Sequence, residues 1–408
     1  MTATNPVPAP SANRPRLVLR GPAVIGTLLS DAAVVLDGAV VAYAGPQSGW
    51  TQAPDDDVVD LAAGQVMVPG LVDLHCHGAY GVDFSRADAA EVRKAVSGLH
   101  RAGSTTVMAS LVTDEPESLL RQLGVLAGLA EEGLVAGIHL EGPFLSEVRC
   151  GAQDPRWLLA PDLELAQELI HAGRGHLRTM TYAPELSGAD ALVELLAANG
   201  VTPSLGHTAC TAGQAHDSLA RARQLLAGSG NAGARPTVTH LFNGMDPIHH
   251  RAPGAVSSCL RAAAAGNAAV ELIADNTHLD PYIVAAMFDL LGAGNIALVT
   301  DSMAAAGLAD GQYRLGPAEV LVQDGVARLV STGSIAGGTA AMADLVRNAV
   351  GAGVDLADAV ASAAAVPAGV LGRGNELGAL VPGAAADLLV LDESLVPVRV
   401  LRRGQWIS

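Results

Sequence analysis

The chain contains few charged or aromatic residues and almost no lysine. Only 16% of its 408 residues are charged, 3% are aromatic, and Lys94 is the one lysine among 24 basic residues. Acidic residues number 41, so the formal net charge is −17. Nucleic acids and anionic membranes are bound through broad basic surfaces, and this charge balance therefore argues against both as partners.

Cysteines are also few, and no hydrophobic run is long enough to cross a membrane. The four cysteines are scattered without a CxxC pair, which argues against a disulfide framework and favours an intracellular protein. Residues 1–16 are rich in proline, alanine and serine without an apolar core, so we expect a loose tail rather than a signal peptide. The Ala-rich stretch at 355–371 is interrupted by two aspartates and a proline. We therefore expect a cytoplasmic protein.

Hydrophobic residues make up half of the chain, which is enough for a large buried core. Short β-type runs occupy residues 1–65, and the segment from 377 to 408 is again β-like. Between them, apolar strands alternate with helical segments rich in alanine and leucine. We expect a catalytic domain at 66–376 and one small β domain built from 1–65 and 377–408.

The middle region contains eight apolar segments that we predict to be strands. They cover residues 66–75, 105–111, 134–142, 177–185, 201–207, 236–242, 269–275 and 295–301. Eight buried strands with intervening helices are typical of a (β/α)8 TIM barrel.

Side chains that can bind metals stand where five of these strands end. They are His75 and His77 at the first strand, Glu141 at the third, His207 at the fifth, His240 at the sixth and Asp301 at the eighth. The carboxyl ends of barrel strands meet at the face where active sites form. Residues two apart on a strand share one face, so the two histidines of the first strand point the same way. The pattern predicts a site for one or two divalent cations.

Metal-assisted hydrolysis is the chemistry that such a site favours. A bound cation activates water and polarises a carbonyl, and Asp301 would act as the general base and then as the acid. Many two-metal barrels bridge their ions with a modified lysine on the fourth strand, but Lys94 lies in a helical segment between the first two strands. Glu141 is therefore the expected bridge.

Eight sequence stretches resemble the N-acetylglucosamine-6-phosphate deacetylase family of the amidohydrolase superfamily. They are PGLVDLHCHG (69–78), HLEGPF (139–144), SLGHT (204–208), THLFNGM (239–245), HRAPG (250–254), IADNTHLDP (273–281), LVTDSM (298–303) and GALVPGAAADLLVLD (378–392). The combination of HLEGP, THLFN and RxPG is specific. The resemblance implies a metal-bearing barrel with a small β-sandwich made from both chain ends, and deacetylation of the sugar phosphate in amino-sugar catabolism and recycling.

The resemblance also implies roles for individual residues. Glu141, His207 and His240 match the principal metal ligands, and Asp301 matches the catalytic acid and base. Some members lack the histidine pair and hold one ion; because the pair is present here, the resemblance is compatible with a second ion bridged by Glu141, and the number of ions stays open at one or two. Zinc is the first choice, and iron, manganese and cobalt suit the same donors.

Substrate contacts follow from the same resemblance. Asn243 and the backbone of Gly244 match phosphate contacts, as does Arg251, which in a homodimer would reach across the interface. A planar guanidinium suits a phosphate. His278 matches a histidine that contacts the sugar or its carbonyl oxygen.

Three positions depart from the family pattern. Gln153 stands where a histidine is common, Gly244 replaces a frequent alanine, and the loop from Ile335 lacks a serine that often ends its motif. We expect Gln153 and Ile335 to line the substrate site, with sugar specificity open. Cys150, three residues before Gln153, could be a metal ligand, a redox-sensitive thiol or an ordinary loop thiol.

Two alternatives remain open at this point. One is an amidohydrolase for a different N-acetylhexosamine phosphate or another amide, such as a cyclic amidase or a deaminase. The other is a catalytically silent protein on the same scaffold. A phosphate-binding Arg251 argues against an uncharged ring substrate, and Asp301 argues against a silent scaffold.

Overall fold

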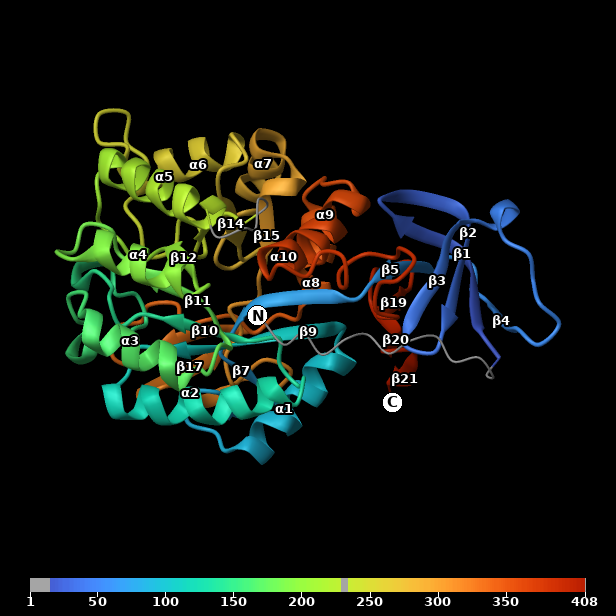
Figure 1. Cartoon of the computed structure of the whole chain (residues 1–408), viewed down its shortest axis with the longest axis horizontal. Helices are drawn as coiled ribbons and strands as arrows, with labels where there is room; N and C mark the ends of the chain where they lie inside the picture. The colour runs from blue at the N-terminus through green and yellow to red at the C-terminus, as the bar shows by residue number, and fades with distance from the viewer. Residues whose placement is uncertain (1–14, 229–233, 408) are drawn as a thin grey trace.

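The computed structural model describes residues 15–228 and 234–407. Most of the expected tail at 1–16 lies outside these residues, and so does the middle of the stretch 226–235, whose glycine and alanine content favours a loop. Eight parallel strands form the centre of the molecule (Figure 1). They are β6 (Leu71–Cys76), β9 (Ser104–Val112), β10 (Ile138–Glu141), β11 (Leu177–Tyr182), β12 (Thr202–Leu205), β13 (Thr237–Val238), β14 (Ala269–Leu272) and β15 (Ile296–Leu298).

These strands pair in chain order from β6 to β15, and every neighbouring pair is parallel. The first and last strands are joined at their carboxyl ends, where the Asp301 N–H donates to the His75 carbonyl at 2.8 Å and the His77 N–H donates to the Ser302 carbonyl at 2.7 Å. The sheet therefore closes at its carboxyl end, and the predicted TIM barrel is confirmed.

Helices surround the barrel (Figure 1). They are α1 (Ala89–Arg101), α2 (Pro116–Glu131), α3 (Leu163–Ala172), α4 (Ala189–Ala198), α5 (Ala212–Gly228), α6 (Gly254–Ala264), α7 (Pro281–Leu291), α8 (Met342–Gly351), α9 (Leu356–Ala363) and α10 (Ala365–Val370). Among the described residues, no helix has the length and apolar character needed to cross a membrane.

Helix α1 illustrates how local sequence sets these elements. It begins after Asp88, whose carboxylate accepts from the N–H of Glu91, while the Glu91 carboxylate accepts from the Asp88 N–H. Val92 and Val96 are buried on its inner face, as the helical repeat requires. Lys94 lies on the exposed face, so the one lysine of the chain is outside the barrel.

A second sheet, built from both ends of the chain, lies beside the barrel (Figure 1). Its strands are β1 (Leu17–Ile25), β2 (Thr27–Asp37), β3 (Val40–Pro46), β4 (Asp57–Asp60), β5 (Val66–Pro69), β19 (Leu388–Leu391), β20 (Pro397–Arg402) and β21 (Gln405–Ile407). β19 pairs antiparallel with β5, and the β3 edge is bonded to the segment before β19 through Val41 and Ala384. The sheet thus curls around a common apolar core.

Residues 66–69, which we expected to begin the first barrel strand, instead belong to this second sheet as β5. The chain passes from β5 to β6 at Gly70, where a Cβ would lie 2.2 Å from Thr105 Oγ1 and 2.8 Å from Asp387 Cβ. Only a residue without a side chain fits this crossing. Because residues 66–75 form one continuous, largely apolar stretch, the sequence pattern did not reveal that the chain changes from one sheet to the other at Gly70.

A three-stranded antiparallel sheet, which was not expected, lies in the sequence between the last barrel strand, β15, and α8. It comprises β16 (Gly311–Leu315), β17 (Ala318–Gln323) and β18 (Val326–Leu329). Its apolar side packs on Val112, the last residue of β9, and on Met303, which follows β15. Leu315 lines the cavity described below. This sheet therefore forms part of the wall at the carboxyl end of the barrel.

Candidate active site

Six of the predicted residues meet at the carboxyl end of the barrel in two groups of three. The groups are His75, His77 and Asp301, and Glu141, His207 and His240. Within each group the nitrogen and oxygen atoms that could bind a metal lie within 4.8 Å of one another, and all six residues are buried. Both groups have a donor set suited to a divalent transition metal.

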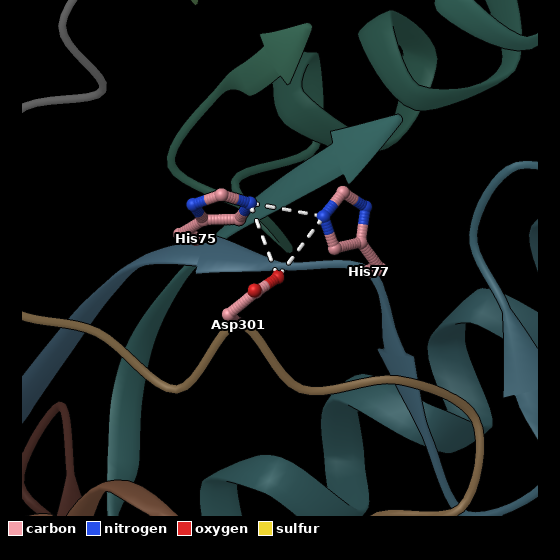
Figure 2. Close-up of side chains that lie close together, drawn as sticks. All are labelled: His75, His77 and Asp301. Carbon is pink, nitrogen blue, oxygen red and sulfur yellow. Dashed lines mark hydrogen bonds and ion pairs between the residues drawn. The ribbon is translucent and has the colours of Figure 1, made fainter. Parts of the chain in front are cut away.

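The first group converges on one point between the end of β6 and the loop after β15. The Nε2 atoms of His75 and His77 are 2.9 Å apart, and each lies 3.3 Å from Oδ1 of Asp301. Figure 2 shows the His75 imidazole on the strand and the His77 imidazole just beyond its end, with the Asp301 carboxylate approaching from a loop. The two-residue spacing at the end of β6 brings the two rings together, as the sequence predicted.

The Glu141 carboxylate lies between the two groups. Its Oε1 is 2.9 Å from Nε2 of His207 and 2.9 Å from Nε2 of His240, while its Oε2 is 3.1 Å from Nε2 of His77. One oxygen therefore faces each group. This is the geometry that a carboxylate bridging two cations requires.

Three of these residues have backbone conformations that L-amino acids seldom adopt. The φ angles are +46° for His207, +26° for His240 and +45° for Asp301. Each stands two or three residues after a barrel strand, so the turn directs its side chain into the barrel mouth. Such conformations cost free energy, of order 1–3 kcal/mol each, and concentrate at functional sites.

Two of the four imidazoles are held from behind through Nδ1. His75 Nδ1 donates to Oε2 of Glu271 at 3.1 Å, and His207 Nδ1 donates to the Arg149 carbonyl at 2.8 Å. In both rings Nε2 is thereby left with the lone pair that a metal needs. Sequence reasoning missed Glu271, because it lies within β14 rather than after it; as the only charged residue between Ala269 and Leu272 it was detectable.

The charges of the site favour a cation. Burial lowers the pKa of His77, but Asp301 and Glu141 outweigh that effect and raise it to about 9. Burial raises the pKa of Asp301, and the imidazoles of His75 and His77 outweigh it, so that this pKa falls below its usual range. These carboxylates stabilise positive charge between them, carried by an imidazolium or by a metal ion.

His139 belongs to neither metal group, although it precedes Glu141 by two residues. Its Nδ1 lies 3.0 Å from Ser110 Oγ and its Nε2 lies 2.8 Å from Thr181 Oγ1. Burial and the neighbouring His75 hold its pKa well below the usual range, so the ring stays neutral. It packs edge-on against His75, with ring centroids 4.4 Å apart.

Gln153 lines the cavity above the site and also hydrogen-bonds to Glu141. Its Nε2 donates to Oε2 of Glu141 at 2.6 Å, and its Oε1 accepts from the Thr113 N–H at 2.7 Å. The carboxamide therefore orients the carboxylate that faces both groups. Cys150, on the same loop, is half-buried and is in neither group.

A cavity of about 230 Å³ opens over the two groups. Its lining includes the predicted residues Gln153, Asn243, Gly244, His278 and Ile335, together with Asp301. His278 Nδ1 donates to Asp275 Oδ2 at 2.8 Å, so its Nε2 is available to the cavity. Burial lowers the pKa of His278, and the Asp275 carboxylate outweighs this and raises it.

Arg251 is the one predicted substrate residue that does not line this cavity. Its side chain is exposed, and Nη1 donates to His250 Nε2 at 2.7 Å. Within the described residues, Arg251 therefore does not reach the cavity over the two groups of its own chain.

Known proteins resemble the chain over nearly its full length. It is 31% identical over 398 residues to the N-acetylglucosamine-6-phosphate deacetylase of Bacillus subtilis, covering 92% of this chain and 96% of that protein. It is 34% identical over 353 residues to the N-acetylgalactosamine-6-phosphate deacetylase of Escherichia coli, covering 84% and 88% respectively.

Solved structures give the same result. A variant of the N-acetyl-D-glucosamine-6-phosphate deacetylase of Mycobacterium smegmatis, solved with N-acetyl-D-glucosamine-6-phosphate, superposes with a TM-score of 0.88 at 38% identity. The superposition covers 96% of this chain and 99% of that one. The sequence profile of the Amidohydrolase family matches residues 66–407. With its barrel, its two groups of possible metal ligands and these relatives, the chain belongs to the amidohydrolase family.

Proposed function

We propose that the protein hydrolyses the acetamide of N-acetyl-D-glucosamine 6-phosphate to D-glucosamine 6-phosphate and acetate. The observation that carries the proposal is the Glu141 carboxylate, with one oxygen toward each histidine group and Asp301 beside it in the cavity. Relatives that carry this activity by name cover nearly the whole chain at 31–38% identity. A phosphorylated substrate of this kind fits a cytoplasmic enzyme.

The residues fit a pair of metal ions. His75, His77 and Asp301 would hold one ion and His207 and His240 the other, with Glu141 between them; zinc is the first choice, with iron, manganese or cobalt as alternatives. When bound, such ions lower the pKa of water and polarise the acetamide carbonyl.

The chain's own groups then move the protons. Asp301, whose carboxylate is ionised at neutral pH, accepts the proton of the attacking water and returns it to the departing amine. His278 is held by Asp275, whose carboxylate favours the protonated ring, and in that form its Nε2–H donates a hydrogen bond to the developing oxyanion.

Substrate binding uses the remaining cavity residues. Asn243 and the backbone of Gly244 contact the phosphate, and Gln153 and Ile335 lie along the sugar. Arg251 is exposed outside its own cavity, which fits a homodimer in which it reaches the phosphate of the partner's site. Its guanidinium would pair bidentately with that anion.

Removal and return of metal tests the reaction. We expect the purified protein to release acetate from N-acetylglucosamine 6-phosphate, to lose this activity after chelation and dialysis, and to regain it when zinc is added. Activity that persists in protein shown to be metal-free by mass spectrometry would contradict the proposal.

The N-acetylgalactosamine epimer is the second candidate substrate. The relative named for that epimer is 34% identical to this chain, and Gln153 stands where a family histidine is common. The kcat/KM for acetate release from N-acetylglucosamine 6-phosphate and from N-acetylgalactosamine 6-phosphate decides which of the two is the preferred substrate.

A further inference from the structure

Glu271 is a buried carboxylate that touches both metal groups without belonging to either. It lies on β14 with 2% of its surface exposed. Oε2 accepts from His75 Nδ1 at 3.1 Å and from the backbone N–H of His240 at 3.2 Å. No lysine or arginine contacts this carboxylate within the described residues, so its charge faces only the histidines of the site.

The contact with Glu271 fixes the proton of His75. An ionised carboxylate only accepts hydrogen bonds, so the ring hydrogen lies on Nδ1 and the lone pair lies on Nε2. That Nε2 is the atom 2.9 Å from His77 and 3.3 Å from Asp301. Glu271 therefore presents the metal-binding nitrogen of His75 toward the first group.

In each group, only one of the two histidines has a hydrogen-bond acceptor at Nδ1 among the described residues. In the first group, His75 has an acceptor at Nδ1, whereas Nδ1 of His77 is buried without a hydrogen-bond partner among the described residues. In the second group the Arg149 carbonyl holds His207, and Nδ1 of His240 has no such partner in the same part of the chain. Each group therefore depends on a single anchored imidazole, and Glu271 anchors that of the first.

We propose that Glu271 is a positioning residue that sets the occupancy of the His75, His77 and Asp301 position, while the His207 and His240 position fills without it. This inference rests on the two-ion site proposed above. Partners of metal-binding histidines change metal affinity by about 10- to 100-fold when removed. Loss of Glu271 should therefore convert a two-ion protein into a one-ion protein at intermediate zinc concentrations.

The test compares wild type, Glu271→Gln and the control Asp387→Asn. Gln keeps the shape of the side chain and removes its charge, and Asp387 is a buried carboxylate of the terminal region that accepts from the Arg403 N–H. Each protein is dialysed against buffered free Zn²⁺ over a concentration series, and bound zinc is counted by mass spectrometry. Anomalous diffraction at the zinc edge then locates the ions.

We expect two ions in wild type and in Asp387→Asn. In Glu271→Gln we expect one ion, at His207 and His240, with zinc binding at the first group weakened about 10- to 100-fold. Two ions in Glu271→Gln across the whole series would overturn the role of Glu271 alone. A single ion in wild type at saturating zinc would overturn the two-ion site and this role together.

Thermal unfolding of the zinc-free proteins would reveal a folding defect in Glu271→Gln. A second variant keeps the proposal testable in that case. Glu271→Asp keeps the charge but is shorter by one methylene group, so it withdraws from His75 Nδ1. We expect the same loss from the first group in this variant. Undiminished zinc binding there would contradict a positioning role.

Discussion

The Asp301 carboxylate lies 3.3 Å from Nε2 of both His75 and His77, and it lines the cavity. Its role can be separated from metal binding. We expect Asp301→Asn to retain at least the ion at His207 and His240 but to lose about 10²–10⁴-fold in kcat, the range typical of a general acid and base. The checks are kcat and zinc content of the same preparation; turnover close to wild type would contradict the assignment.

Gly70 shows how one residue determines a connection between sheets. A Cβ there would lie 2.2 Å from Thr105 Oγ1, so we expect Gly70→Ala to destabilise the fold by about 1–3 kcal/mol through overpacking. Gly124, within α2, has open space around it, and Gly124→Ala should stabilise the fold by about 0.5–1 kcal/mol through helix propensity. Urea denaturation of both variants measures the difference; equal effects would refute the packing argument.

At the scale of single elements, the last turn of α1 contains a buried imidazole. Burial and the nearby Arg402 lower the pKa of His100 to about 4, and its Nδ1 donates to the Ser104 carbonyl at 2.8 Å. Protonation is thus disfavoured in the folded state, whereas the unfolded chain takes up a proton near pH 6.5. Stability from this residue is complete above pH 6.5 and is lost as pH falls toward 4.

The expected loss at His100 is about 3 kcal/mol between pH 6.5 and 4. His100→Gln cannot titrate, so the free energy of unfolding of this variant should depend less on pH in that window. Urea denaturation at several pH values, with the same zinc content in both proteins, gives the comparison. Parallel pH profiles for the two proteins would show that His100 has an ordinary pKa.

Elements were predictable where the hydrophobic pattern changed at a boundary. The barrel strands are largely apolar, and five of them end in, or within three residues of, a polar residue of the site; that contrast identifies both the strand and its carboxyl end. The change from β5 to β6 was not predictable, because a packing clash at Gly70 separates two apolar runs that read as one. β16–β18 were missed because their strands are short and half exposed.

The site was predictable to the same extent. His75, His77, Glu141, His207, His240 and Asp301 stand at strand ends, where the barrel brings them together. Glu271 and the Gln153 contact with Glu141 depend on which side chains face each other across the barrel. One sequence contains no record of those contacts.

At the scale of the whole molecule, the proposed homodimer accounts for the exposed position of Arg251 outside its own cavity. We expect a homodimer in solution, and Arg251→Ala should raise KM for the phosphorylated substrate. Mixing Arg251→Ala with Asp301→Asn subunits tests the interface directly, because a mixed dimer would contain one site with both wild-type residues. Recovered activity supports a contribution across the interface; an inactive mixture, or an active monomer in a mass measurement, contradicts it.

The central claim is that this metal site removes the acetyl group of a phosphorylated N-acetylglucosamine. Its most direct test is acetate release by zinc-analysed protein from N-acetylglucosamine 6-phosphate, with N-acetylgalactosamine 6-phosphate and unphosphorylated N-acetylglucosamine in parallel. We predict the highest kcat/KM for the first substrate and a large loss without the phosphate. Zinc-loaded protein that is inert on N-acetylglucosamine 6-phosphate but turns over another acetamide would contradict the account.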